Sequence, residues 1–236
     1  MIPLLRGLLI GLLVLGTAVG CGQSATDTDS EAANDAPATE TEETEVAEAE
    51  AEAEADRDTE PTGDWQEFEG AGLVLSLPEG YTGGNPSTDL DRLAAELEAI
   101  DPQYAQSIEG IRENPEAIAF LAFDPASADS GFLTNVNIAT ESVPAEITIE
   151  QYLEAATQQL AQLYEIESQE ITAVGDYEAG KIVGQFSAEG LEVKQLFYAI
   201  KSEDTFWIVT YATAAAEFES RLPDFERSIQ SLELES

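Results

Sequence analysis

The three strand-like segments at 177–187, 191–201 and 204–213 constrain the fold of this chain most strongly. They are rich in β-branched and aromatic residues, and only two or three residues separate each segment from the next. Such short connections join antiparallel neighbours, because a parallel pair needs a crossover of a dozen or more residues. The sequence therefore predicts an antiparallel meander.

The last of these segments also predicts its own place in the sheet. Strand alternation divides its side chains into two sets, one for each face: Phe206, Ile208 and Thr210 against Trp207, Val209 and Tyr211. Both sets are largely apolar. We therefore expect a central strand that is covered by helices on two sides.

Helical patterns occur before and after the meander. Thr148 and Gln151 form a capping box ahead of an apolar stripe that includes Leu163, which predicts a helix over 148–164. Pro223 predicts a break in the final helix. The other expected elements are strands at 72–81, 117–124, 133–143 and 169–176, and helices at 89–100, 102–112 and 215–234. This order predicts an α+β fold, an α/β/α sandwich with a central antiparallel sheet covered by helices on both faces.

The amino-terminal segment has the pattern of a secretory leader. Arg6 precedes 14 uncharged, leucine-rich residues, 7–20. A helix needs roughly 20 apolar residues to cross a bilayer. The length therefore favours a signal peptide over residues 1–20. A membrane anchor with a short helix is the alternative interpretation.

Cys21, the only cysteine, follows this leader directly. The residues 18–21, Ala-Val-Gly-Cys, resemble the lipobox of bacterial lipoprotein signal peptides, although Ala18 stands where leucine is usual. The resemblance implies that a diacylglyceryl group is attached to the Cys21 sulfur and that the chain is cleaved before it. Cys21 is thus predicted to be a lipidation site, and the mature protein is predicted to start there.

The stretch after the cysteine has a different composition. Residues 22–63 contain 15 acidic residues, one basic residue and no aromatic residue. Like charges repel and nothing supplies an apolar face, so we interpret 21–63 as an acidic, disordered tether. Aromatic residues begin at Trp65, and the folded domain is expected to cover 64–236.

Composition excludes several classes of function. The chain has no histidine, which rules out Ser-His-Asp and Cys-His catalysis and every histidine metal site. A single cysteine rules out thiolate zinc and iron–sulfur sites. A formal net charge of −39 is incompatible with phosphate recognition, so no nucleic-acid partner is expected. We predict no catalytic, cofactor-binding or metal-binding residues.

Carboxylates are the main remaining candidates for a site. Asp89 and Asp91 stand at an expected helix start, where capping is favoured over calcium binding. Glu165 and Glu167 flank Ile166, and a solvated strand face is the favoured interpretation. A pair of glycosidase-like carboxylates stays open as an alternative.

Two other groups of residues have alternative interpretations. A Ser-Lys dyad would combine Ser187 or Ser202 with one of the three lysines, Lys181, Lys194 and Lys201. Four aromatic residues line either a ligand groove or, as we favour, the core: Trp65, Phe206, Trp207 and Tyr211.

Three segments, 72–81, 132–160 and 205–234, are similar to the Mog1/PsbP-like superfamily, which includes small bacterial lipoproteins related to the PsbP protein of photosystem II. The similarity extends over about 65–234. It implies a non-enzymatic accessory protein at the outer or lumenal side of a membrane. Some PsbP relatives bind metal through aspartate and histidine, and this chain has no histidine for that role.

The leading hypothesis is a lipid-anchored accessory protein without catalytic activity, on the periplasmic or thylakoid-lumenal side. It would reach the membrane through the lipid on Cys21, bind a protein partner, and assist the assembly or stability of a membrane or envelope complex of the photosystem II type. One alternative is a periplasmic carrier of a small apolar ligand or divalent cation in a sheet–helix cleft. Another is a hydrolase that works with carboxylates alone.

Overall fold

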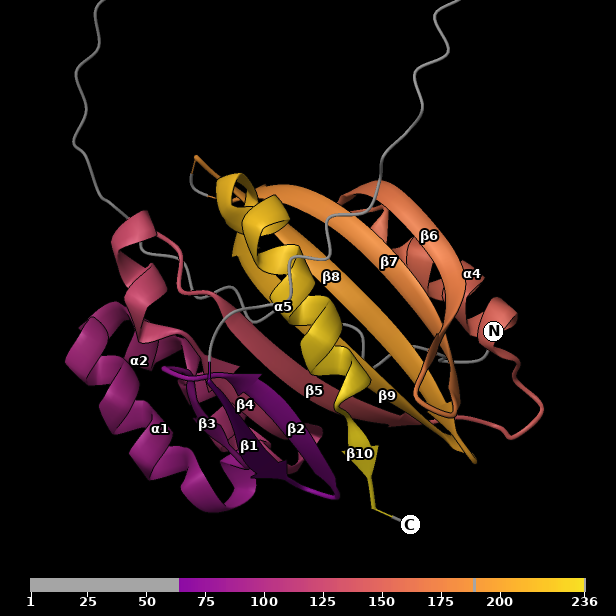
Figure 1. The fold of residues 1–236 in the computed structure, drawn as a ribbon, viewed down its shortest axis with the longest axis horizontal. Coiled ribbons are helices and arrows are strands. Elements are labelled where there is room, and N and C mark those ends of the chain that lie inside the picture. The colour runs from indigo at the N-terminus through magenta and orange to yellow at the C-terminus, as the bar shows by residue number, and fades with distance from the viewer. Residues whose placement is uncertain (1–63, 189, 236) are drawn as a thin grey trace, which may run out of the picture. The chain divides into compact units, whose positions relative to one another are not determined.

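The computed structural model describes residues 64–188 and 190–235, which form two antiparallel sheets and five α-helices. The expected leader, Cys21 and the acidic tether lie outside the described residues. The large sheet has the strand order β3-β4-β5-β9-β8-β7-β6, and the small one β1-β2-β10 (Figure 1). The strands of the large sheet are β3 (Thr82–Gly84), β4 (Ile118–Phe123), β5 (Asn135–Ser142), β6 (Glu165–Val174), β7 (Tyr177–Ala188), β8 (Leu191–Ser202) and β9 (Thr205–Ala214).

The large sheet confirms the expected antiparallel meander. Strands β7, β8 and β9 pair in sequence order, and β9 pairs on its other side with β5. Strand β9 is therefore central, and its alternate side chains enter two different apolar clusters, as the alternation predicts. The predicted α+β class, with a central antiparallel sheet between helices, is confirmed.

Helices cover both faces of the large sheet (Figure 1). On one face, α4 packs against β6 to β8, and α1, α2 and α3 pack near β3 and β4. On the opposite face, α5 contacts β2 and β9. The helix bounds are α1 (Pro86–Ile100), α2 (Pro102–Ser107), α3 (Glu109–Glu113), α4 (Ile149–Leu160) and α5 (Phe218–Gln230).

The capping box at the start of α4 is confirmed. The Gln151 amide N–H donates to Thr148 Oγ1 at 3.3 Å, and the Thr148 N–H donates to Gln151 Oε1 at 3.1 Å. The predicted end of this helix is wrong, because α4 stops at Leu160. Leu163 is 59% exposed instead of joining the apolar stripe.

Two other predicted helix boundaries are also wrong. Helix α1 begins at Pro86, because Asn85 caps it by accepting the Ser87 N–H at 2.9 Å. Helix α5 continues through Pro223 without a break. A proline removes one backbone hydrogen bond from a helix. The burial of Phe225 and Ile229, which follow Pro223, favours continuing the helix despite that loss. No helix in the described part of the chain is long and apolar enough to span a bilayer.

The small sheet is the main departure from the single predicted sheet. It consists of β1 (Trp65–Gly70), β2 (Leu73–Pro78) and β10 (Glu233–Leu234). The strand predicted over 72–81 is divided at Pro78 and Gly80, whose φ of 101° turns the chain, so that β2 and β3 join different sheets. The strand β1 was not predicted.

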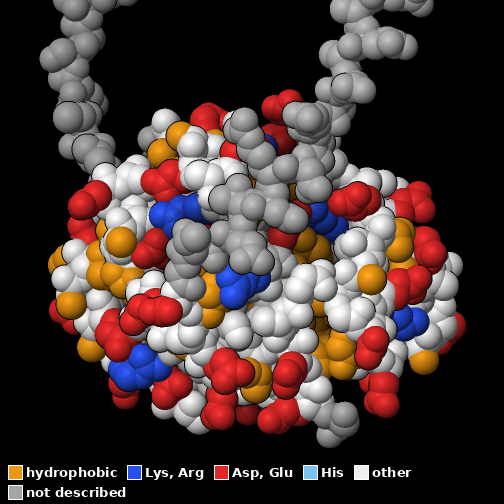
Figure 2. Space-filling model, in the orientation of Figure 1, with side chains coloured by type: hydrophobic (Ala, Val, Ile, Leu, Met, Phe, Trp, Pro, Cys, Tyr) orange, Lys and Arg blue, Asp and Glu red, His pale blue; other side chains and the backbone are white. Residues whose placement is uncertain are grey.

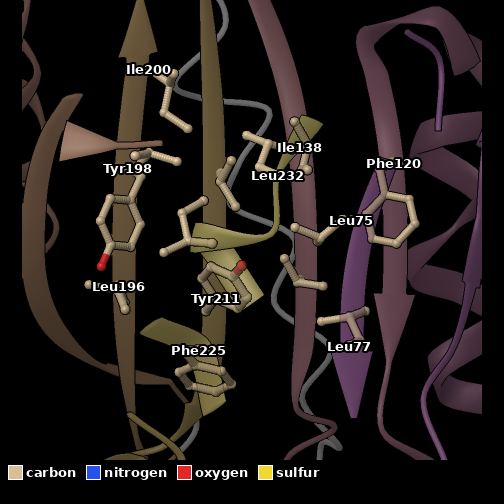
Figure 3. Packing of buried hydrophobic residues seen from close by; sticks show 14 of the residues in the cluster. Leu75, Leu77, Phe120, Ile138, Leu196, Tyr198, Ile200, Tyr211, Phe225 and Leu232 are labelled. Atoms are coloured by element: carbon tan, nitrogen blue, oxygen red, sulfur yellow. The ribbon is translucent and has the colours of Figure 1, made fainter. Parts of the chain in front are cut away.

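The small sheet is attached to the large one by a close backbone contact. The Ala71 N–H donates to the Ala119 carbonyl at 2.8 Å, where a bulge in β4 interrupts its pairing with β5. A Cβ at Gly70 would lie 2.9 Å from the same oxygen, so this approach requires glycine. Leu75 and Leu77 of β2 then pack with Phe120 and Ile138 of the large sheet (Figure 3).

A chain of hydrogen bonds also runs through this core. Tyr211 of β9 donates to Ser228 Oγ at 2.9 Å, and the Ser228 hydroxyl donates to the Ser76 carbonyl of β2 at 2.8 Å. Burial raises the pKa of Tyr211, so its hydroxyl stays protonated and serves as the donor. These bonds connect the large sheet, α5 and the small sheet.

Candidate functional site

A cleft of about 630 Å³ lies between the small sheet and the β3 edge of the large sheet. Strand β1 contributes Glu67 and Glu69 to its lining, β10 contributes Glu233, and the first turn of α1 contributes Asp89. Phe68, Val74, Gly83 and Gly84 complete the lining. We call this hollow the acidic cleft.

Strand register brings the carboxylates of the acidic cleft together. Val74 of β2 pairs with Glu69 on one side and with Glu233 on the other. Directly paired residues of antiparallel strands project from the same face. Glu67 shares that face because it lies two residues before Glu69. Three carboxylates therefore surround one valine on the outer face of the small sheet.

Glycines allow the other wall to approach closely. A Cβ at Gly83 would lie 2.8 Å from the Leu121 carbonyl oxygen, and one at Gly84 would lie 2.8 Å from Arg92 Nη2. Arg92 uses this space to donate to the Gly83 carbonyl at 2.9 Å. The start of α1 is thereby held against β3, which places Asp89 at the cleft.

The negative charge of the acidic cleft is only partly neutralised. Asp89 lies 3.5 Å from Arg92. Glu67, Glu69 and Glu233 form no salt bridge with any residue of the described ranges. Unpaired like charges that share a concave surface repel one another, and a cationic group from outside relieves that repulsion.

The basic side chains of the described domain already have partners. Six of the seven form salt bridges or donate hydrogen bonds to carbonyls, and the guanidinium of Arg227 lies 4.3 Å from the centre of the Trp65 ring. Figure 2 shows acidic side chains widely distributed over one face around a few basic ones. The seven are Arg92, Arg112, Lys181, Lys194, Lys201, Arg221 and Arg227.

The lysines do not form the proposed Ser-Lys dyad. Burial by itself would lower the pKa of Lys181, but its hydrogen bond to Glu226 at 2.8 Å and nearby negative charge outweigh burial and raise that pKa. Burial would also lower the pKa of Lys194, but Glu167, whose carboxylate lies 2.6 Å from the ammonium, raises it. A lysine that stays protonated is no general base. The Ser187 hydroxyl donates to Glu192 instead.

Lys201 and the predicted acidic pairs have structural partners as well. Lys201 donates to the Ile147 carbonyl at 2.6 Å. Asp89 lies in the first turn of α1, where its Oδ2 accepts the Asn85 N–H at 3.2 Å, but the N-cap is Asn85. Asp91 lies inside the helix, 3.0 Å from Arg112, and caps nothing. The predicted solvated face at Glu165 and Glu167 is confirmed, since both residues are exposed.

The four aromatic candidates are separated by the fold. Phe206 stacks on Tyr152 with ring centres 4.0 Å apart, and Tyr211 lies in the opposite cluster, which confirms that both belong to the core. Trp207 lines a second hollow of about 220 Å³, together with Glu203 and Asp204. Among residues 64–188 and 190–235, no three His, Cys, Asp or Glu side chains are grouped so that they could hold one metal ion.

The carboxyl group of Glu141 in β5 is partly buried. Burial raises its pKa, and a hydrogen bond from the Tyr152 hydroxyl at 2.8 Å opposes that effect. A carboxyl with a raised folded pKa binds more protons in the folded state than in the unfolded state. Stability therefore falls as the pH rises from the ordinary value near 4.5 through the raised pKa.

Replacing Glu141 with glutamine is expected to remove this penalty while keeping an oxygen that accepts from Tyr152. The variant should unfold at a higher temperature than the parent at pH 7, and the difference should vanish below pH 4.5. Thermal unfolding followed by circular dichroism from pH 3.5 to 7.5 checks this. The exposed Glu146→Gln serves as the control, and a parent that is more stable than Glu141→Gln at pH 7 would contradict the expectation.

The acidic cleft was not predicted from the sequence. The alternation in Trp65–Gly70 carries a local signal for a strand with two glutamates on one face. No local signal connects these glutamates with Glu233, which lies more than 160 residues later. That association depends on the pairing of β10 with β2.

Comparisons with known proteins give weak structural similarities. No protein-family model matches the chain, and no curated protein matches it. Among solved structures, the chain is similar to the cyanobacterial PsbP (CyanoP) of Synechocystis sp. PCC 6803, at 9% identity and a TM-score of 0.48. That match covers 76% of this chain and 97% of the other.

Two further structures show comparable similarity. LpqN, involved in cell envelope biogenesis of Mycobacterium tuberculosis, matches at 12% identity and a TM-score of 0.47, over 75% of this chain and 88% of the other. The type VI secretion immunity protein TplEi of Pseudomonas aeruginosa matches at 8% identity and a TM-score of 0.43, over 72% and 97%. These values are too low to assign the chain to a family or to transfer a function.

Proposed function

We propose that this protein is a lipid-anchored, extracytoplasmic accessory protein without catalytic activity, and that it binds a partner protein through the acidic cleft. The observation that carries the binding proposal is the arrangement of Glu67, Glu69 and Glu233 around Val74. None of these three glutamates forms a salt bridge with a lysine or arginine of the described residues. The anchor is inferred from the leader and Cys21.

The negative charge of the acidic cleft favours a basic partner. Its carboxylates attract lysine or arginine, while Val74 offers apolar contact to the methylene stems of those side chains. Residues 64–236 carry 33 acidic and 7 basic residues, so long-range attraction also favours a basic surface. The partner we infer is a protein that presents a basic segment on the outer face of the membrane.

An affinity capture with matched variants tests this proposal. The full-length protein is recovered from membranes in detergent, with its bound proteins, from cells that carry either the parent or the triple variant Glu67→Gln, Glu69→Gln, Glu233→Gln. The expected result is that one or more basic partners are recovered with the parent and reduced about tenfold with the variant, which corresponds to about 1.4 kcal/mol of binding energy. Binding should also weaken as salt is raised.

The control changes the net charge equally at exposed glutamates outside the cleft. Glu98→Gln, Glu146→Gln and Glu178→Gln remove three negative charges from residues that form no salt bridge in the described domain. The control should recover the partner as well as the parent does. Equal losses from both triple variants would show a general charge effect and would contradict a role for the acidic cleft.

A further inference from the structure

The hollow of about 220 Å³ beside Trp207 lies where the turn between β8 and β9 meets the end of β10 (Figure 1). Two aromatic residues line it, Tyr177 at the start of β7 and Trp207 of β9. Three carboxylates line it as well, those of Glu203 and Asp204 in the turn and of Glu235 directly after β10. We call it the aromatic hollow. It has no lining residue in common with the acidic cleft.

Strand pairing places the two aromatic residues on the same face of the large sheet. Trp207 pairs with Ile200 of β8, Ile200 pairs with Ala179 of β7, and Tyr177 lies two residues before Ala179. Directly paired residues share a face, and so do alternate residues of one strand. Two strand spacings and two residues of chain separate the backbones of Tyr177 and Trp207 by roughly 12 Å. This separation leaves room between the side chains for a small cation, whose contact with an aromatic ring extends to about 6 Å.

The Trp207 side chain is accessible, because it is only half-buried and the three carboxylate residues around the hollow are exposed. A Cβ at Gly72 would lie 3.4 Å from Trp207 Cη2. Gly72 has a φ of 77°, which favours glycine, so residue 72 places no side chain over this end of the ring. The Glu235 N–H donates to the Gly72 carbonyl at 3.0 Å, which holds the end of β10 beside the hollow.

The negative charge of the aromatic hollow is not neutralised within the described domain. Glu203, Asp204 and Glu235 take part in no salt bridge there, and no lysine or arginine of the described ranges lines the hollow. The three carboxylates are also not grouped so that they could hold one metal ion. Aromatic rings with carboxylates at longer range favour a cation whose charge is spread over several atoms.

We propose that the aromatic hollow binds a small quaternary ammonium cation of the choline type. Such a cation has no N–H group to donate, so it is held by aromatic rings and by the field of nearby carboxylates. The ammonium of lysine, in contrast, is compact and strongly hydrated, and it requires three acceptors at hydrogen-bond distance. Sites for drug-sized molecules measure about 300–1,000 Å³, so a hollow of about 220 Å³ selects a smaller ligand.

The three carboxylates also favour a free cation over a zwitterion. An anionic group next to the quaternary nitrogen, as in phosphocholine, would be repelled by Glu203, Asp204 and Glu235. A lipid headgroup of that kind should therefore bind more weakly than choline itself. The site is independent of the proposed partner protein, because no residue of the acidic cleft takes part in it.

Calorimetric titration of the full-length protein with choline, in an uncharged maltoside detergent, tests the proposal. We expect saturable binding whose Kd is weakened about tenfold by Trp207→Leu and about threefold by Tyr177→Leu. Tyr177→Phe keeps the ring and should bind choline as the parent does. The triple variant of the acidic cleft should also bind choline unchanged. Equal affinities of the parent, Trp207→Leu and Tyr177→Leu would place the cation elsewhere and overturn the proposal.

Two other ligands test the chemistry of recognition. The alcohol 3,3-dimethylbutan-1-ol has the shape of choline without its charge, and phosphocholine adds an anionic group. Both should bind at least about tenfold more weakly than choline. Equal binding of the alcohol would show a merely apolar hollow, and equal binding of phosphocholine would show a headgroup site. Either result would contradict a site for a free quaternary cation.

Glu203 allows binding to be separated from folding. Its φ of 55° lies in the region that favours glycine, so Glu203→Gly should not lower the unfolding temperature. The same variant should weaken choline binding about threefold, because it removes one carboxylate from the hollow. The exposed Glu146→Gln, remote from the hollow, serves as the charge control and should bind like the parent. Unchanged affinity in Glu203→Gly would rule out a role for that carboxylate.

The indole N–H resonances give a direct readout of the site. The chain has two tryptophans, Trp65 and Trp207, so Trp207→Phe assigns both signals. Choline should shift the Trp207 signal in a saturable way and leave the Trp65 signal in place. The absence of any shift of the Trp207 signal at saturating choline would reject the inference.

Discussion

Replacing Cys21 with alanine is expected to abolish incorporation of fatty acid into the protein. The thiol is the only sulfur nucleophile in the chain, so no other residue takes over its lipidation. Each buried CH₂ contributes about 0.8 kcal/mol to membrane binding, and one chain gives weak, reversible binding where two give a stable anchor. Labelling with radioactive fatty acid, together with the intact mass of the protein, measures the loss directly.

The composition of residues 22–63, the expected acidic tether, adds to this prediction. Its 15 acidic residues are repelled by anionic lipid headgroups, so electrostatics provides no second membrane signal. The parent should therefore stay with the membrane in high salt and start at a lipid-modified Cys21, whereas Cys21→Ala should keep its uncleaved leader. Ser24→Ala, three residues later, should behave like the parent. Fatty acid on Cys21→Ala, or none on the parent, would refute lipidation at this residue.

Replacing Phe120 with alanine is expected to cause the largest loss of stability. Phe120 is fully buried in β4, and its ring meets that of Phe68 edge to face with centres 5.9 Å apart. Removing a buried phenylalanine costs about 3–5 kcal/mol through lost burial and the cavity left behind. At roughly 2–4 °C per kcal/mol for a domain of this size, the unfolding temperature should fall by roughly 6–20 °C.

Calorimetry on the purified variants provides the measurement. Phe120→Leu keeps most of the buried volume and should lose less than half as much. Leu163→Ala removes a side chain that is 59% exposed and should change stability by about 0.5 kcal/mol or less. If Phe120→Ala unfolded at the same temperature as Leu163→Ala, the packing of the small sheet on the large sheet would be wrong.

The elements that were predicted well are those whose signals are local. The capping box joins two residues only three apart, and the turns of the meander bring their strands together over a few residues. A short turn or a capping pair brings its residues together by chain geometry, so these contacts do not depend on the packing of distant segments. The alternation in β9 is equally local, and it correctly divided Phe206 from Tyr211.

The errors arose where packing overrides a local signal. Leu163 follows the periodicity of α4, but the helix has ended and no surface covers the side chain. Pro223 is a helix breaker by its chemistry, yet the burial of Phe225 and Ile229 favours continuing the helix through it. A proline in a helix interior costs about 3 kcal/mol, whereas burying two large apolar side chains contributes about 1.5–3 kcal/mol for each.

The sequence by itself determined the α+β class, the order of the main elements and the absence of histidine and thiolate chemistry in the domain. Only the tertiary structure decided which polar groups meet. Glu69 and Glu233 become neighbours because β1 and β10 pair with opposite edges of β2. Asn137 and Thr210 meet because β5 pairs with β9 across more than 70 residues of chain. Pairing between distant strands depends on the whole core, and no short stretch of sequence records it.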